Sequence, residues 1–244
     1  MKHKIITFGE LMLRLSPDNN ERFTQAHSYE AVYGGGEANT AVSLANFNVD
    51  TRYVTKLPKH TIGQSAVNSL RQYGVDVSRI VRGGDQIGIY FLEKKTSQRP
   101  TNVIYNRNGS AFALATKEDF DWDSIFDGAT WFHFSGITPA ISDNMAEITI
   151  EACKEAKKRG ITVSCDLNYR SKLWSSEKAN KVMSEVCRYV DICIANEDDA
   201  VGIFGMDASK SDKEKNAYIA EELTKMFPNF KMVASVWRTE TSIT

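Results

Sequence analysis

The most informative stretch of the sequence is residues 33–45, which read Tyr33-Gly34-Gly35-Gly36-Glu37-Ala38-Asn39-Thr40-Ala41-Val42-Ser43-Leu44-Ala45. Three glycines lead directly into helix-forming residues, so we expect a helix over residues 38–47. Glycine allows a ligand to approach the backbone closely, and the free N–H groups of the first helical turn point toward that ligand. The Asn39 amide can both donate and accept hydrogen bonds. The stretch therefore predicts a site for a small polyhydroxylated ligand or an anion.

Two common phosphate-binding motifs do not fit this glycine run. A Walker loop requires Gly-Lys-Ser/Thr, and the chain contains no Gly-Lys pair. The dinucleotide fingerprint follows the first strand directly and has a third glycine where this chain has Asn39. The first strand is expected at residues 4–8, well upstream of the glycines. A glycine-rich loop without a ligand remains the structural alternative.

The rest of the chain alternates between apolar strand patterns and helical patterns. Strands are expected at residues 4–8, 52–56, 131–135, 161–166, 191–195 and 231–236, and further helices at 65–73, 144–159, 177–189 and 211–226. Asn48 is expected to end the first helix in the left-handed conformation that glycine usually supplies. Alternation at this spacing predicts an α/β fold with a mostly parallel sheet flanked by helices.

Three further segments predict β-strands outside this alternation. Residues 11–16 alternate between apolar and polar and are followed by a turn, while residues 87–93 and 101–107 predict a hairpin that turns near Ser97 and Gln98. No linker divides the chain, so we expect a single domain with these strands as an insertion.

The hairpin register places several functional side chain types on one face. With a turn at Ser97–Gln98, Tyr90 faces Tyr105 and Gly88 faces Arg107, and Tyr105 and Arg107 project together because they are two residues apart. Two phenol hydroxyls and a guanidinium would then line one side of the small sheet. The structural alternative is a cross-strand tyrosine pair with a solvated arginine.

Polar residues follow two of the expected parallel strands. Asp166-Leu167-Asn168-Tyr169-Arg170 comes after one strand, and Asn196-Glu197-Asp198-Asp199 comes after the next. Ligands of open parallel sheets bind beyond the carboxyl ends of the strands, so both segments point toward one edge. Arg170 and Arg107 could hold a carboxylate by bidentate, charge-assisted hydrogen bonds. The alternatives are a surface arginine and an acidic run that only caps a helix.

Several of these motifs resemble the pfkB family of ribokinase-like sugar kinases. The Gly-Gly pair with Glu37-Ala38-Asn39 is similar to the first family signature, residues 5–10 resemble its first strand, and Lys56-Leu57-Pro58 with Gly63 resembles the downstream continuation. The resemblance runs from residue 4 to about residue 236. It implies one ribokinase-like α/β domain over residues 1–244, with lid strands from about 11–33 and 87–107.

The resemblance also implies a substrate, cofactors and site residues. Residues 166–170 with Leu173-Trp174 look like the branch that phosphorylates 2-keto-3-deoxygluconate, an acid sugar whose carboxylate ribose and fructose lack. The family uses ATP and Mg²⁺. The implied substrate-binding residues are Gly34, Gly35, Asn39, Tyr90, Tyr105, Arg107 and Arg170. Asn168, Asn196 and Asp199 are implied on the cofactor side, with Asp199 reaching Mg²⁺ through water, although the family motif has Glu in its place.

One family element has no match in the sequence. The family's catalytic base is an aspartate in a Gly-Ala-Gly-Asp-like motif, whereas no glycine follows Gly205, and Gly83-Gly84-Asp85 lies in the lid region. No catalytic residue is therefore assigned here, and we expect that aspartate to lie beyond Thr244. Two other functions stay open: a kinase for a neutral sugar such as fructose or ribose, and a non-catalytic sugar-binding fragment.

Bulk properties limit the partners and the location. The 30 basic and 31 acidic residues give a net charge of −1, which favours neither nucleic acid nor a membrane surface. No apolar run reaches the roughly 18–20 residues of a membrane span, and the N-terminus lacks a signal peptide pattern. The four cysteines show no metal-ligand spacing, so we expect buried, reduced thiols in a cytoplasmic protein. Open lid edges favour a homo-oligomer.

Overall fold

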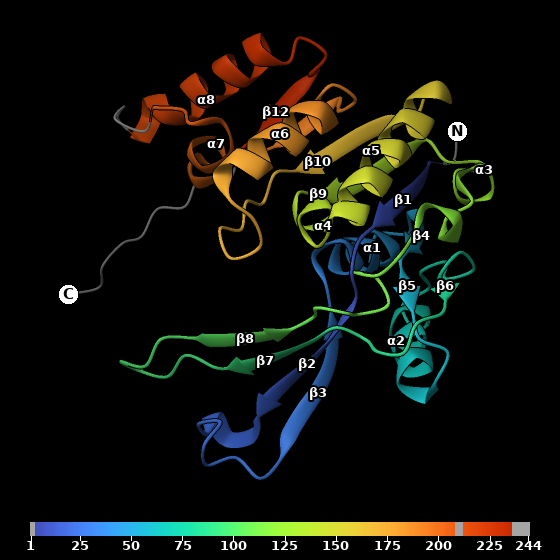
Figure 1. The fold of residues 1–244 in the computed structure, drawn as a ribbon, viewed down its shortest axis with the longest axis vertical. Coiled ribbons are helices and arrows are strands. Elements are labelled where there is room, and N and C mark those ends of the chain that lie inside the picture. The colour runs from blue at the N-terminus through green and yellow to red at the C-terminus, as the bar shows by residue number, and fades with distance from the viewer. Residues whose placement is uncertain (1–2, 208–211, 236–244) are drawn as a thin grey trace.

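The central feature of the computed structural model is a six-stranded parallel sheet (Figure 1). The structure describes residues 3–207 and 212–235. The strand order is β12-β11-β10-β9-β1-β4, and every neighbouring pair is parallel. The strands are β1 (Lys4–Phe8), β4 (Asp50–Val54), β9 (Trp131–Ser135), β10 (Thr162–Asp166), β11 (Ile192–Ile194) and β12 (Met232–Ala234). The α/β fold with a mostly parallel sheet is thus confirmed.

Helices contact both faces of this sheet. Val54 packs in the cluster that contains the buried side chains of the later helices, whereas Tyr53 packs in the cluster of the early helices. Because successive strand residues point to opposite faces, the two clusters lie on opposite sides of the sheet. The early helices are α1 (Gly36–Asn46) and α2 (Thr61–Arg71), and the later ones are α3 (Trp122–Ile125), α4 (Ile137–Ala140), α5 (Asp143–Lys158), α6 (Ser176–Cys187), α7 (Glu197–Phe204) and α8 (Asp212–Met226).

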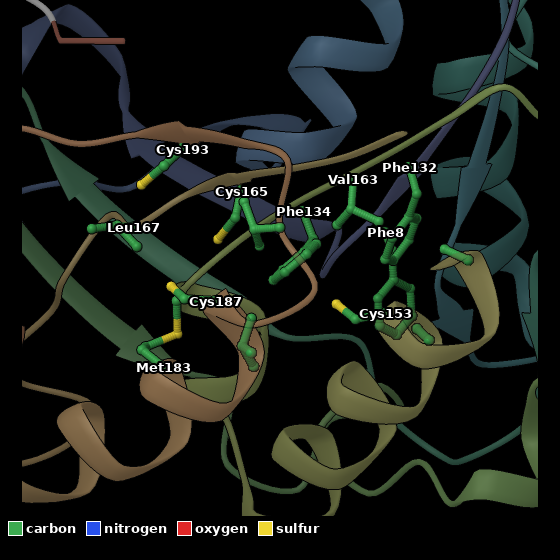
Figure 2. Packing of buried hydrophobic residues seen from close by; sticks show 14 of the residues in the cluster. Phe8, Phe132, Phe134, Cys153, Val163, Cys165, Leu167, Met183, Cys187 and Cys193 are labelled. Atoms are coloured by element: carbon green, nitrogen blue, oxygen red, sulfur yellow. The ribbon is translucent and has the colours of Figure 1, made fainter. Parts of the chain in front are cut away.

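The main core lies between the sheet and helices α5 and α6. Figure 2 shows Phe8, Phe132 and Phe134 beside the cysteines, with Phe132 and Phe134 stacked at a centroid distance of 5.4 Å. The four cysteines are free and buried, as predicted, and are Cys153, Cys165, Cys187 and Cys193. Burial raises the pKa of all four thiols, so they behave as small apolar core groups.

The predicted lid is a separate four-stranded sheet that extends away from the central sheet (Figure 1). Its order is β3-β2-β7-β8, with strands β2 (Met12–Pro17), β3 (Tyr29–Gly34), β7 (Ile89–Glu93) and β8 (Asn102–Asn106). The hairpin register is confirmed, because Tyr90 pairs with Tyr105 and the bridge between Thr96 and Arg99 encloses the turn at Ser97 and Gln98.

Several element boundaries differ from those expected. The first helix already begins at Gly36, and the second begins at Thr61 because the His60 side chain accepts a hydrogen bond from the Gly63 amide at 3.4 Å. The strand expected at 52–56 stops at Val54, and β5 (Lys56–Leu57) pairs instead with β6 (Val81–Arg82). Asn48 has a φ of 60°, which confirms its predicted left-handed conformation.

Short 3₁₀ segments complete the described chain, at Asp18–Asn20 after β2 and at Lys117–Asp119 before α3. Ser211, Val236 and Thr244, which bound three of the sequence-based expectations, lie outside the described residues. Within residues 3–207 and 212–235, no helix is both long and apolar enough to cross a membrane.

Candidate functional site

Polar side chains gather where neighbouring parallel strands end. Gly9 and Glu10 follow β1, Ser135 closes β9, and Asp166 closes β10 in direct register with Ser135. Asn196 follows β11, the next strand of the sheet. This row is the carboxyl edge of the sheet, where ligands of parallel α/β proteins bind.

Helix α1 brings a buried carboxyl group to this edge. Glu37 lies in its first turn and is only 4% exposed. Burial raises the pKa of this carboxyl, and a hydrogen bond with Ser135 partly opposes that rise. Its Oε1 atom has no hydrogen-bond partner among the described residues. A buried acid with a free oxygen at the strand ends is an acceptor or, when protonated, a donor for a bound hydroxyl group.

Asp166 and Asp199 form the acidic centre of the edge. Burial raises the pKa of Asp166 to about 6, and the charges of Asp199 and Glu37 raise it further. Burial also raises the pKa of Asp199, which accepts hydrogen bonds from the Tyr169 amide at 2.6 Å and the Asn196 amide at 3.1 Å. Like charges that share a buried site disfavour ionisation, so this edge holds its protons more tightly than exposed carboxyls do.

The lid presents tyrosines and an arginine from one of its faces. The rings of Tyr90 and Tyr105 lie 5.8 Å apart, and the Arg107 guanidinium lies 5.9 Å from the Tyr105 ring centre. The Tyr90 hydroxyl is 3.5 Å from the point where a Cβ atom on Gly34 would lie. The three side chains share a face as the strand register predicted, and this face also meets the glycine stretch at Gly34.

Arg107 is not a solvated side chain, so that structural alternative is wrong. Its side chain is 8% exposed, and both Nε, at 2.8 Å, and Nη2 donate hydrogen bonds to Oε2 of Glu10. The other Glu10 oxygen accepts a hydrogen bond from the Ser110 hydroxyl at 2.6 Å. The guanidinium is thus held in one orientation at the base of the lid, and its positive charge lowers the pKa of Glu37 nearby.

Arg170 approaches the same edge from the loop that follows β10. The side chain is exposed, and its charge lowers the pKa of both Asp166 and Asp199. Asn168, in the same loop, has a φ of 40°, a left-handed conformation that asparagine tolerates better than most residues. The charges of Arg170 and Arg107 thus both act on the acidic row, Arg170 on Asp166 and Asp199 and Arg107 on Glu37.

Asn39 lies in a different environment from the lid residues. It lines a cavity of about 460 Å³ between β3, α1 and α2, together with Tyr33 and Tyr73. Tyr90, Tyr105, Arg107 and Arg170 do not line that cavity. The predicted sugar contact of Asn39 remains a prediction, as do the contacts of Gly34 and Gly35.

Asn196 and Asp199 form a complete capping box for helix α7. The Asn196 side chain accepts a hydrogen bond from the Asp199 amide at 2.9 Å, and the Asp199 carboxylate accepts one from the Asn196 amide. This is the capping role considered from the sequence. In residues 3–207 and 212–235, no group of three His, Cys, Asp or Glu side chains could hold a metal ion.

Sequence reasoning did not select two residues that the structure places at the site. Glu10 directly follows a predicted parallel strand, so the rule that drew attention to Asp166 also applies to it. Glu37 is the one charged residue of α1, and that contrast was the available signal.

The fold and the site together define a class of protein. A parallel α/β sheet whose carboxyl edge is approached by a β-lid is the arrangement of ribokinase-like proteins, and the solved neighbours below share it. The chain belongs to the pfkB family of carbohydrate kinases, whose model matches residues 2–229. The family resemblance seen in the sequence is confirmed.

Individual relatives agree with this assignment. The chain is 37% identical over 209 residues to a 2-dehydro-3-deoxygalactonokinase of Haloferax volcanii, covering 85% of this chain and 65% of that protein. It is 29% identical over 179 residues to a 2-dehydro-3-deoxygluconokinase of Bacillus subtilis, covering 72% of this chain and 55% of that protein. The chain thus spans less than two thirds of the length of these curated relatives.

Solved structures show the same likeness. A 2-dehydro-3-deoxygluconokinase of Thermotoga maritima superimposes with a TM-score of 0.93 and 49% identity, covering 96% of this chain and 71% of that one. A pfkB family carbohydrate kinase of Listeria grayi superimposes with a TM-score of 0.90 and 34% identity, covering 98% of this chain and 73% of that one.

Proposed function

We propose that the protein is a sugar kinase that transfers the γ-phosphate of ATP to a hydroxyl group of a 2-dehydro-3-deoxy sugar acid, such as 2-dehydro-3-deoxygluconate. The pfkB membership and the two relatives named for such substrates support the reaction class. The observation that carries the choice of an acid sugar is that two arginines, Arg107 and Arg170, place positive charge on the carboxyls of this edge. Guanidinium groups bind carboxylates by paired, charge-assisted hydrogen bonds.

Each proposed substrate contact uses a chemical group suited to its task. Tyr90 and Tyr105 offer hydroxyl groups to the sugar, and their rings cover its apolar faces. Gly34 and Gly35 let the sugar approach the backbone, and Asn39 adds an amide that can donate and accept. Arg107 and Arg170 bind the carboxylate. Closing the lid over these contacts would exclude water from the sugar.

The proposed cofactors are ATP and Mg²⁺. Bound Mg²⁺ would neutralise charge that develops on the transferred phosphoryl group. Asn168, Asn196 and Asp199 are proposed on the cofactor side. Each Asp199 oxygen accepts one backbone hydrogen bond and keeps a lone pair for a Mg²⁺-bound water. We assign no catalytic base among the described residues.

The proposal extends to location and self-association. We place the protein in the cytoplasm, with a small-molecule sugar acid and neither nucleic acid nor a membrane as its partner. We further propose that the lid mediates a homo-oligomer, because β3 and β8 are its outer strands and Ile104 on β8 is 50% exposed. Sedimentation velocity of the wild-type chain and of Ile104→Lys tests this, and a monomeric wild-type chain would exclude it.

Titration calorimetry tests the substrate. The ligands are 2-dehydro-3-deoxygluconate and 3-deoxyfructose, which has CH₂OH in place of the carboxylate. We expect the wild-type chain to prefer the acid, and Arg170→Ala to reduce acid binding about tenfold or more while changing the neutral sugar little. Arg188→Ala, which removes an exposed arginine directly after α6, is the matched control.

A coupled ADP-release assay with the same sugar acid separates the functions left open by the sequence. Sugar-dependent ADP release supports the kinase. Binding of the acid without turnover by the intact native protein supports a non-catalytic sugar-binding protein. Equal or tighter binding of the neutral sugar contradicts the acid-sugar proposal and favours a neutral-sugar kinase.

A further inference from the structure

Glu10 is the point at which the base of the lid meets the central sheet. It follows β1, and its side chain is only 3% exposed. Arg107, directly after β8, donates two hydrogen bonds to its Oε2, and Ser110 donates one to its Oε1. The Ser110 hydroxyl is itself fixed by the Ala113 amide at 3.1 Å.

Two glycines leave room for Glu10, Gly88 for its carboxylate and Gly35 for its main-chain carbonyl. A Cβ atom on Gly88, just before β7, would lie 2.5 Å from Oε1 of Glu10, too close for any side chain. A Cβ atom on Gly35 would overlap the Glu10 carbonyl oxygen. Glu10 is therefore contacted by the residues at both ends of the lid hairpin, Gly88 and Arg107, and by the glycine stretch at Gly35.

The contact with Glu10 determines which edge of the Arg107 guanidinium remains available. A guanidinium has one edge that includes Nε and one end formed by the two Nη atoms. Nε and Nη2 donate to Glu10, so the first edge is occupied. Nη1 has no partner in the part of the chain that the structure describes, and Nη2 retains a second hydrogen. The end of the guanidinium is thus left for a ligand carboxylate.

We infer that Glu10 is a positioning residue that makes Arg107 an end-on receptor for the sugar carboxylate; this inference rests on the proposed function. Glu10 touches neither the proposed sugar nor the phosphate. It acts by holding the planar guanidinium at the angle that two parallel N–H···O bonds require. It also neutralises the charge of Arg107, so that Arg170 supplies the net positive charge of the site.

The positioning role predicts that removing the Glu10 charge weakens carboxylate binding, whereas simple electrostatics predicts that it strengthens binding. Glu10→Gln keeps the size of the side chain but removes its charge, which leaves Arg107 uncompensated. Coulomb attraction alone would then strengthen binding of any carboxylate. Loss of orientation weakens it instead, because a mobile guanidinium must be ordered again when the ligand binds.

The experiment measures dissociation constants for 2-dehydro-3-deoxygluconate and 3-deoxyfructose by calorimetry. We expect Glu10→Gln to reduce the preference for the acid by about tenfold, with the neutral sugar changed less than about twofold. Glu93→Gln is the matched control, because Glu93 is also buried and forms a second ion pair in the lid, with Arg99 at 3.4 Å. It should leave the preference unchanged.

If Glu10→Gln does not fold, a more conservative variant can be tested in its place. Glu10→Asp retains the charge but withdraws the carboxylate by one methylene group, and it should lose part of the preference. An unchanged or increased preference in either Glu10 variant, or an equal loss for both sugars, overturns the positioning role alone. A wild-type chain that binds neither sugar overturns the proposed substrate and this role together.

Discussion

At the scale of single residues, Asp166 is a carboxyl group whose ionisation is unfavourable in the folded chain. Its pKa is raised from 3.8 to about 6, mainly by burial and then by the neighbouring charges of Asp199 and Glu37. The folded chain therefore binds the Asp166 proton more tightly than the unfolded chain does. This contribution to stability is complete below about pH 4 and is lost as the pH rises through about 6.

Asp166→Asn removes this pH dependence. We expect the variant to gain about 1–2 kcal/mol relative to wild type at pH 7.5 and to gain nothing at pH 4, measured by urea unfolding. Asp143→Asn is the control, because the exposed Asp143 has its pKa lowered by Lys178 and should show the opposite sign. A pH-independent difference for Asp166→Asn would contradict a raised pKa.

The capping role of Asp199 can also be tested by mutation. Its carboxylate accepts the Tyr169 and Asn196 amides, so Asp199→Ala leaves two backbone donors without their partner. We expect a loss of about 2 kcal/mol in the free energy of unfolding. Asp198→Ala, one position earlier and exposed, should change it by less than about 0.5 kcal/mol. Equal effects of the two variants would show that the capping box contributes nothing specific.

At the scale of elements, helix α1 begins in close contact with the backbone that follows strand β1. Gly35 is the N-cap, and a Cβ there would overlap the Glu10 carbonyl oxygen, whereas a Cβ on Gly36 meets nothing within 4 Å. We expect Gly35→Ala to destabilise the fold by about 2–3 kcal/mol, because neither backbone can move freely. Gly36→Ala should be neutral or stabilising by up to about 1 kcal/mol, since alanine is the better helix former. Thermal unfolding of the two variants distinguishes crowding at Gly35 from a general effect of removing glycine.

The elements themselves were largely predictable from the sequence. The strands at residues 4–8 and 131–135 match β1 and β9, because buried parallel strands appear as short apolar runs. The start of α2 was not predictable from hydrophobic periodicity, because it depends on a capping contact from His60. Such a contact depends on side-chain geometry rather than on residue spacing.

The site was predictable where it follows strand ends and lid register, and less so where it depends on distant partners. Tyr90 and Tyr105 pair as their spacing implied. The partner of Arg107 was not apparent, because Glu10 is separated from it by 97 residues and joins it only when the lid folds onto β1. A local pattern carries no information about such a pair.

At the scale of the whole molecule, the central sheet is packed more tightly than the lid sheet that is attached to it. The central strands β9 and β10 are mostly buried, whereas β8 is mostly exposed along its length. The lid contains few of the buried apolar side chains that resist local opening. The lid is attached to the core by the Glu10–Arg107 ion pair and by the close contact of Gly35 with the Glu10 carbonyl oxygen. We therefore expect the lid to pivot at these contacts when it moves.

Hydrogen exchange of the wild-type chain tests this difference in local stability. We expect amides of β8 and the first half of β3 to exchange on the order of 100-fold faster than those of β9 and β10, because the lid opens without unfolding the sheet. Saturating 2-dehydro-3-deoxygluconate should slow exchange in the lid and leave β9 and β10 unchanged, since a ligand that binds only the closed lid shifts that equilibrium alone. Slowing of equal size in both sheets would indicate global stabilisation rather than lid closure. Equal exchange rates in the free protein would show that the lid and the central sheet unfold as one cooperative unit.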